Sequence, residues 1–116
     1  MLFDQTVTIP NGTPTHATGL DTGLTSNHPR TQLVGITFPA AMTSTAMTIT
    51  AASTLAGTYT TMTEVGGATS YSVTVTASRR VPLDPRVFVC APFIKIVTGS
   101  NEGADRVLTL HFREVA

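Results

Sequence analysis

The feature that most constrains this chain is a two-residue alternation between threonine and apolar side chains. It recurs in residues 6–9, 47–50, 72–76 and 108–110. Because successive side chains of a strand point to opposite faces, this period places apolar groups on one face and hydroxyl groups on the other. Threonine occupies 23 of the 116 positions, and its branched Cβ suits a pleated, half-buried surface. The alternation therefore predicts strands that cover a core on one side only.

The rest of the chain continues the strand pattern and has no stretch typical of an amphipathic helix. Turn-forming residues separate the candidates, among them Asn11-Gly12 and Gly66-Gly67. The expected strands are residues 2–9, 32–38, 45–51, 58–65, 70–77, 80–83, 93–98 and 105–113, with a short further candidate around residues 17–20. About eight short strands at this spacing predict an all-β fold, an antiparallel β-sandwich or jelly roll. No segment between them is suited to be the crossover helix of a parallel sheet.

The length of 116 residues predicts one domain over residues 1–116. Residues 1–30 are expected to form a strand and a loop-like arm, and residues 31–116 the main sandwich. The segment 13–30 is rich in Thr, Gly, Pro, Asn and His and is longer than structureless loops in compact domains usually are. We therefore expect it to be functional, or to be ordered by a neighbouring chain.

Alternation also predicts which side chains point into the core. Val34, Ile36 and Phe38 are expected inward, and Leu33 and Gly35 on the opposite face. The other expected inward residues are Met47, Ile49, Tyr71, Val73, Val75, Ile94, Ile96, Leu108, Leu110 and Phe112. The outward set contains His111 on the last strand, and Phe93, Lys95 and Val97, which hint at a second packed surface.

Charge is scarce and balanced. Only 12% of the residues are charged, about half of the roughly 25% in ordinary globular domains, and seven basic residues offset seven acidic ones. A neutral chain lacks the basic stripe that binds nucleic acid, and no apolar run approaches the roughly 20 residues that span a bilayer. The N-terminal residues do not resemble a signal peptide, and a single cysteine excludes an internal disulfide. We therefore expect neither a nucleic-acid nor a membrane partner, and synthesis in the cytoplasm.

Residues that could support catalysis or metal binding do not group in the sequence. Cys90 lies in the apolar run 87–91, where a cysteine usually behaves as a small buried hydrophobe. The three histidines share no ligand spacing, and the carboxylates never form the close sets that glycosidases and calcium loops need. We expect no enzyme activity, metal, cofactor or small-molecule substrate.

The charged residues are interpreted as structural groups or as contacts to a protein partner. Asp84 is expected to cap a turn, and Asp105-Arg106 to open the last strand, with Arg106 paired to a nearby carboxylate. The adjacent Arg79 and Arg80 either protect an edge strand from unwanted pairing or bind an acidic patch on a partner. The candidate partner-contact residues are Arg30, Arg79, Arg80, Arg86, His16 and His28.

Seven segments between residues 31 and 113 carry a likeness to known proteins. They are residues 33–40 (LVGITFPA), 45–51 (TAMTITA), 57–59 (GTY), 66–67 (GG), 81–85 (VPLDP), 93–100 (FIKIVTGS) and 104–110 (ADRVLTL). In this order they resemble small β-sandwich virion proteins of tailed bacteriophages, some of which are similar to the cement (decoration) proteins that sit as trimers on capsids. The resemblance assigns no functional residue, because the shared positions are mostly core and turn positions.

Two functions follow as expectations. The first is a capsid cement or decoration protein that stabilises the phage head as a homotrimer, made in the host cytoplasm and bound to the major capsid protein on the virion surface. A weakly charged, threonine-rich exterior costs little to desolvate against such partners. The alternative is a jelly-roll receptor- or glycan-binding module of a phage fibre or tail, because residues 93–96 resemble a strand of small sugar-binding sandwiches. Against it, the chain has no Trp and only two Tyr residues.

Overall fold

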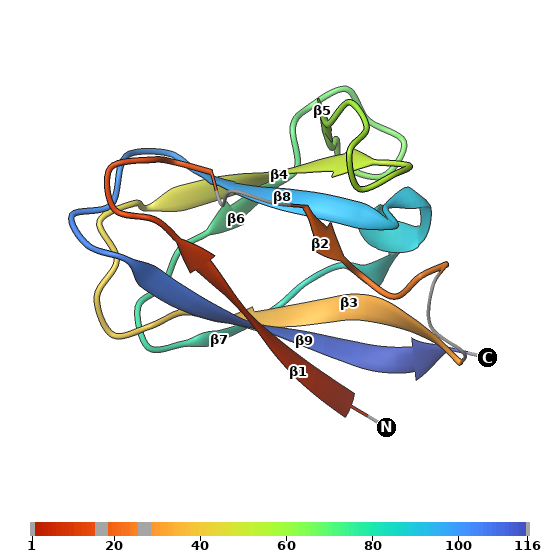
Figure 1. The fold of residues 1–116 in the computed structure, drawn as a ribbon, viewed down its shortest axis with the longest axis horizontal. Helices are drawn as coiled ribbons and strands as arrows, with labels where there is room; N and C mark the ends of the chain where they lie inside the picture. The colour runs from red at the N-terminus through yellow and green to blue at the C-terminus, as the bar shows by residue number, and fades with distance from the viewer. Residues whose placement is uncertain (1, 16–18, 26–28, 116) are drawn as a thin grey trace.

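Nine strands form two antiparallel sheets in the computed structural model, which describes residues 2–15, 19–25 and 29–115. The first sheet has the order β1-β9-β3-β7. Its strands are β1 (Leu2–Ile9), β9 (Arg106–Val115), β3 (Arg30–Thr37) and β7 (Arg80–Pro82). In Figure 1 this sheet is the lower layer, with both chain termini at its right-hand end.

The second sheet is the upper layer of Figure 1 and has the order β2-β8-β4-β5, with β6 also paired to β4. Its strands are β2 (Leu20–Asp21), β8 (Phe93–Thr98), β4 (Ala46–Ala52), β5 (Thr60–Thr61) and β6 (Ser72–Thr74). The two layers face each other across the core, so the prediction of an antiparallel β-sandwich is confirmed. β5 and β6 are shorter than the expected strands 58–65 and 70–77.

The core is the set of side chains that the two layers turn toward each other. Of the predicted inward residues, Ile36 and Phe38 are buried, and so are all those on β4, β6, β8 and β9. Tyr71 and Val75, which flank β6, are half-buried. The prediction was wrong for Leu33, which is fully buried, and for Val34, which is only half-buried. The reason is a register shift in the pairing of β3 with β9 between Leu33 and Gly35. A bulge of this kind adds one residue to a strand, so the side-chain alternation changes phase at that point.

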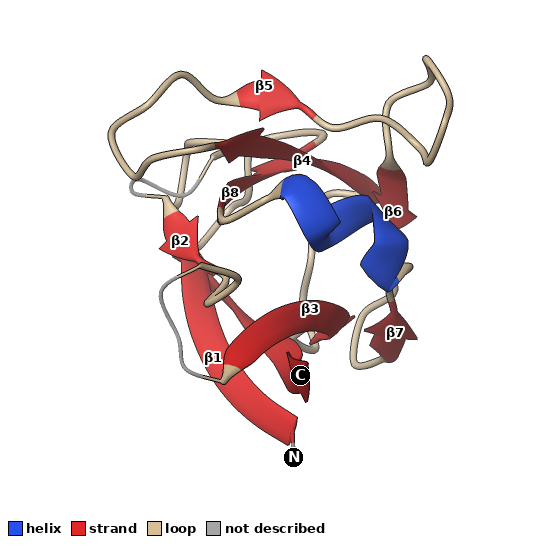
Figure 2. Cartoon of the chain, turned by 90° about the vertical axis from the view of Figure 1, so that its right-hand side faces the viewer, coloured by secondary structure: helices blue, strands red, loops and turns tan. Residues whose placement is uncertain are grey.

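One helical element was not predicted. The 3-10 helix η1 (Pro85–Cys90) crosses the end of the sandwich that faces the viewer in Figure 2, between β3 and β4. The Asp84 side chain accepts a hydrogen bond from the backbone N–H of Arg86 at its first turn, which confirms Asp84 as a cap. A helix of six residues is too short to leave a helical period in the sequence.

The described parts of the loop-rich segment 13–30 lie against the protein's own sheets. Thr15 forms an isolated bridge with Val97, and β2 pairs with β8. The Thr31 N–H donates to the Gly23 carbonyl oxygen at 3.1 Å. The Asn11-Gly12 turn is confirmed, and Gly12 has a φ of +79°, a conformation that favours glycine.

Candidate functional site

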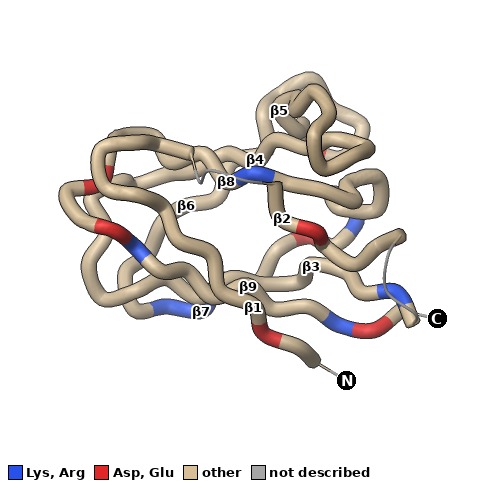
Figure 3. Tube along the Cα trace, in the orientation of Figure 1, with Lys and Arg blue, Asp and Glu red and all other residues tan. Residues whose placement is uncertain are grey.

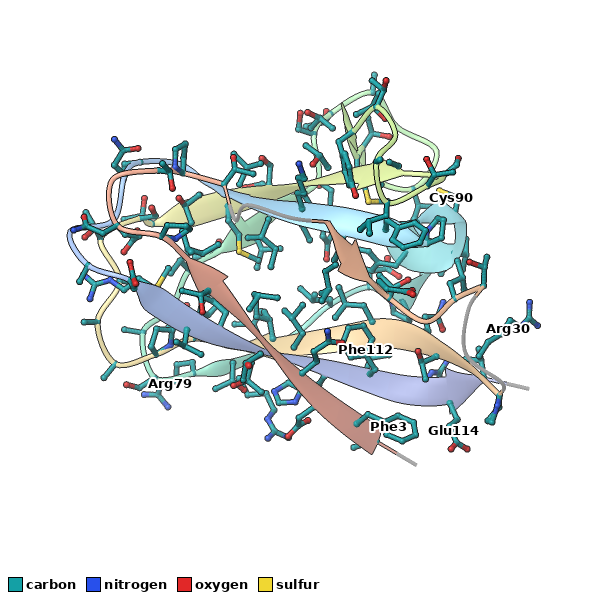
Figure 4. The ribbon with its side chains drawn as sticks, viewed as in Figure 1. Phe3, Arg30, Arg79, Cys90, Phe112 and Glu114 are labelled. Carbon is teal, nitrogen blue, oxygen red and sulfur yellow. The ribbon has the colours of Figure 1, made fainter. Side chains whose placement is uncertain are left out.

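The predicted contact arginines do not converge on one patch. Arg79 precedes β7 and Arg80 begins it, which places both at one edge of the first sheet. Both side chains are exposed. Arg30 begins β3, whereas Arg80 pairs with Thr37 at its other end, which places the two arginines about 23 Å apart along the strand. Figure 4 shows Arg30 and Arg79 at opposite ends of the molecule, and the separated blue segments of Figure 3 show the same spread.

Arg86 is engaged within its own segment. Its guanidinium Nη2 lies 3.0 Å from Asp84 Oδ2. The hydrogen bonds from Arg86 lower the pKa of the Asp84 carboxyl and, in return, raise the pKa of the guanidinium. His16 and His28, the two other predicted contact residues, lie outside the described residues. A role for any of the six residues in contacting a partner stays a prediction.

His111 points away from the core as predicted, but neighbouring strands cover its side chain. Its side chain is only 7% exposed. Nδ1 lies 2.7 Å from Asp4 Oδ1 on β1, and Nε2 lies 2.6 Å from Thr37 Oγ1 on β3. Because a carboxylate only accepts hydrogen bonds, Nδ1 donates, and in the neutral ring Nε2 then accepts from the hydroxyl. Gly35 lies opposite His111 across the ladder between β3 and β9.

The hydrogen-bonded series Asp4–His111–Thr37 has the order of groups that activates a hydroxyl nucleophile in hydrolases. Here the ring is covered, and both of its nitrogens have partners on neighbouring strands. Neither of the two grooves described below is lined by Thr37 or His111. The geometry therefore favours a structural role, in which His111 on β9 is hydrogen-bonded to Asp4 on β1 and to Thr37 on β3.

Glu102 is a buried carboxylate that the sequence analysis did not single out. Its side chain is fully covered, and Arg106 Nε lies 3.0 Å from Oε1. This ion pair confirms the predicted pairing of Arg106, which begins β9 as expected. Oε1 also accepts from the Thr43 N–H at 2.7 Å, and Oε2 from the N–H and hydroxyl of Ser44 at 2.8 and 2.6 Å.

The pKa of Glu102 results from two opposing effects. Burial alone would raise the pKa of the carboxyl, because it disfavours the charged form. The four hydrogen bonds from Ser44, Thr43 and Arg106 outweigh burial and lower the pKa from 4.5 to about 2. The ionised carboxylate thereby fastens the loop before β9 to the loop before β4. An Arg four residues after a Glu was the one signal in the sequence for this contact.

Along β1 the second sheet does not fully cover the core-facing side of the first sheet. Phe3 and Gln5 pair with Phe112 and Leu110 of β9, so they are on the core-facing side of the first sheet. Both are nevertheless exposed, Phe3 by 38%, because β2 above them has only two residues. Figure 2 shows β1 and β2 together at one side of the sandwich. A groove of about 180 Å³ opens there, lined by Phe3, Asp4, Gln5, Asp21, Thr22, Thr31 and Phe112.

A second, larger groove of about 510 Å³ lies between the β5 region and η1. Ser53 and four threonines contribute hydroxyl groups to it, and Glu64 and Arg86 contribute charges. Cys90 also lines this groove and is exposed, so the prediction of a buried cysteine was wrong. In the 3-10 helix, Val87 and Phe88 turn into the core while Val89 and Cys90 turn outward, as Figure 4 shows for Cys90.

The described residues contain no cluster of three or more His, Cys, Asp or Glu side chains that could hold a metal ion. Nor does any helix in this described part have the length and apolar character needed to cross a membrane. No family model, curated protein or solved structure matches the chain.

Proposed function

We propose that this protein is a structural component of a phage particle, a cement or decoration protein that lies on the capsid shell and stabilises the head together with sister subunits. The resemblance described above supports this role and implies a trimer of identical chains. The observation that carries the proposal is the exterior of the domain. Fourteen of the described threonines are exposed, while charged residues make up only 12% of the chain.

Such an exterior suits contact with other protein. Hydroxyl groups keep the surface soluble, yet they cost less to desolvate than ionised side chains do. The cores of protein interfaces are likewise depleted of charge, and Lys and Glu are rare in them. A decoration protein needs broad surfaces of this kind, since it contacts both the shell and its own copies.

Co-sedimentation with tailed-phage capsids assembled without a decoration protein tests the proposal. We expect saturable binding and a higher temperature of head disruption. Because few charges are available, the affinity should change little between about 50 and 200 mM salt, whereas contacts dominated by charge weaken over this range. Absence of binding, at protein concentrations far above those of the capsid sites, would refute the proposal.

Recognition of a glycan is a second candidate, favoured by the 510 Å³ groove beside η1. Its hydroxyls, together with Glu64 and Arg86, offer the converging hydrogen-bonding groups that orient a polar ligand. None of the described residues that line this groove has an aromatic ring on which a sugar could stack. A glycan array tests this candidate: specific hits that are lost in Glu64→Gln would favour it over the capsid role.

A further inference from the structure

The two edges of the first sheet differ in how they are protected against pairing. The β7 edge has only three residues, follows Arg79, begins with Arg80 and ends in Pro82, which has no N–H to donate. Short length, positive charge and proline are the features that block edge pairing. The β1 edge has eight residues and a single charged side chain, Asp4, with no proline inside it. It is therefore the open edge of this sheet.

Two apolar side chains are exposed at the start of the same strand. Leu2 is 65% exposed and Phe3 38%. Phe3 lies on the core-facing side, where it borders the 180 Å³ groove between β1 and β2. Figure 4 shows the Phe3 ring near the N-terminal end of β1. A long unprotected edge flanked by exposed apolar groups has the properties of a strand that pairs with another chain.

We propose that the open edge binds the same edge of a second copy, with β1 antiparallel to β1 about a two-fold axis next to Gln5. The length of the edge supports this occupant: a second β1 matches it almost end to end and would form about six to eight new hydrogen bonds. The β7 edge of another copy offers three residues, of which Pro82 cannot donate. Two-fold pairing through a self-complementary surface is also the commonest form of self-association.

The register follows from which side chains share a face. A two-fold axis perpendicular to the sheet keeps core-facing residues opposite core-facing residues, and an axis at Gln5 meets this condition. It places Phe3 opposite Val7 of the second copy, an aromatic and β-branched pair of the kind that stabilises antiparallel ladders. Leu2 then lies opposite Thr8 of the second copy. An axis one residue further along, at Thr6, would leave Leu2 outside the paired region.

Charge is compatible with this arrangement. Asp4 lies opposite Thr6 of the second copy, so no two like charges are directly opposed. The carboxylate of Asp4 is also hydrogen-bonded to His111 within its own chain. Pairing would join the two first sheets into one continuous sheet of eight strands, since each contributes four. This contact does not depend on the capsid role, and it could also join two trimers.

Mass measurement by light scattering tests the proposal. We expect wild-type protein to form a dimer of the 12.2 kDa chain, or a hexamer if trimers also form. Gln5→Lys places a charge on the core-facing side of the edge and should halve the mass, whereas Ala68→Lys on an exposed loop should not change it. A wild-type monomer or trimer, or a Gln5→Lys mass equal to that of wild type, would overturn the proposal. Circular dichroism establishes that each variant is folded.

Cross-linking tests the register separately. In a Cys90→Ser background, Gln5→Cys places two thiols opposite each other at the axis, within the range of Cα separations that disulfides span. Mild oxidation should then give a covalent dimer, and Thr69→Cys on an exposed loop should not. Failure of the Gln5→Cys pair to cross-link would refute this register. Loss of capsid binding by a protein that still dimerises would refute the proposed function alone.

Discussion

Replacing Glu102 by glutamine is the perturbation whose effect the structure defines best. The amide has nearly the shape of the carboxylate but carries no charge and has one acceptor oxygen in place of two. In the native site, Thr43 and Ser44 present two N–H groups and a hydroxyl to the carboxylate, and Arg106 presents a guanidinium. The amide nitrogen of glutamine would face one of these donors, so at least one buried hydrogen bond is lost.

The magnitude follows from the pKa of the carboxyl, which falls from 4.5 to about 2 on folding. Each pKa unit corresponds to ~1.4 kcal/mol of preferential stabilisation of the ionised form, so ionised Glu102 contributes about 3 kcal/mol to the free energy of unfolding. Because the folded-state pKa is the lower one, this contribution is complete above about pH 5 and is lost as the pH falls toward 2. It is a large share of the roughly 5–15 kcal/mol typical of a domain.

Urea unfolding of the wild type and Glu102→Gln at several pH values measures the effect. At pH 7 we expect the variant to be about 3 kcal/mol less stable, and at pH 3 the difference should shrink to about 1.4 kcal/mol. Glu114→Gln is the matched control, because Glu114 is exposed near the end of β9 and its replacement should change stability by less than about 0.5 kcal/mol. A Glu102→Gln effect below about 1 kcal/mol at pH 7, or one that does not change with pH, would refute the reasoning.

Three further predictions concern single contacts. Thr37→Val leaves the buried Nε2 of His111 without its hydroxyl partner, so urea unfolding should show a loss of about 1–3 kcal/mol, and an unchanged midpoint would contradict the hydrogen bond. Gly12→Ala forces alanine into a φ of +79° and should cost about 1 kcal/mol in the same assay, whereas Gly103→Ala, which meets no nearby atom and has no positive φ, should be neutral. Cys90 should react with a maleimide in native buffer as fast as in urea, and protection in the native state would show that the thiol is buried.

The strand alternation was sufficient to predict the fold class and most of the core. It was not sufficient for β3, where the bulge between Leu33 and Gly35 reverses the side-chain phase. A bulge depends on the pairing partner, here β9, and partners are not visible in local sequence. His111 shows the same dependence. Its direction followed from alternation, but its burial requires Asp4 and Thr37 on two other strands.

Two other features depended on loops rather than strands. Glu102 looked like one polar residue in a Gly-rich loop, and only the approach of the segment before β4 gives it four donors. Cys90 sits in an apolar run, but the run folds as a 3-10 helix in which Val87 and Phe88 turn into the core and Val89 and Cys90 stay exposed. In both cases the environment comes from backbone geometry that a period of two does not describe.

The position of a strand in its sheet decides what its threonines do. Thr6 and Thr8 on β1 and Thr48 and Thr50 on β4 alternate with apolar residues in the same way, yet the first pair is exposed and the second half-buried. β4 has neighbours on both sides, whereas β1 is an edge. Alternation therefore selects the face on which a hydroxyl lies, and strand order selects whether that hydroxyl is free for a partner. In the first sheet β1 is the long edge strand, and the contact with a second copy is assigned there because of its unprotected backbone edge and not because of its hydroxyl groups.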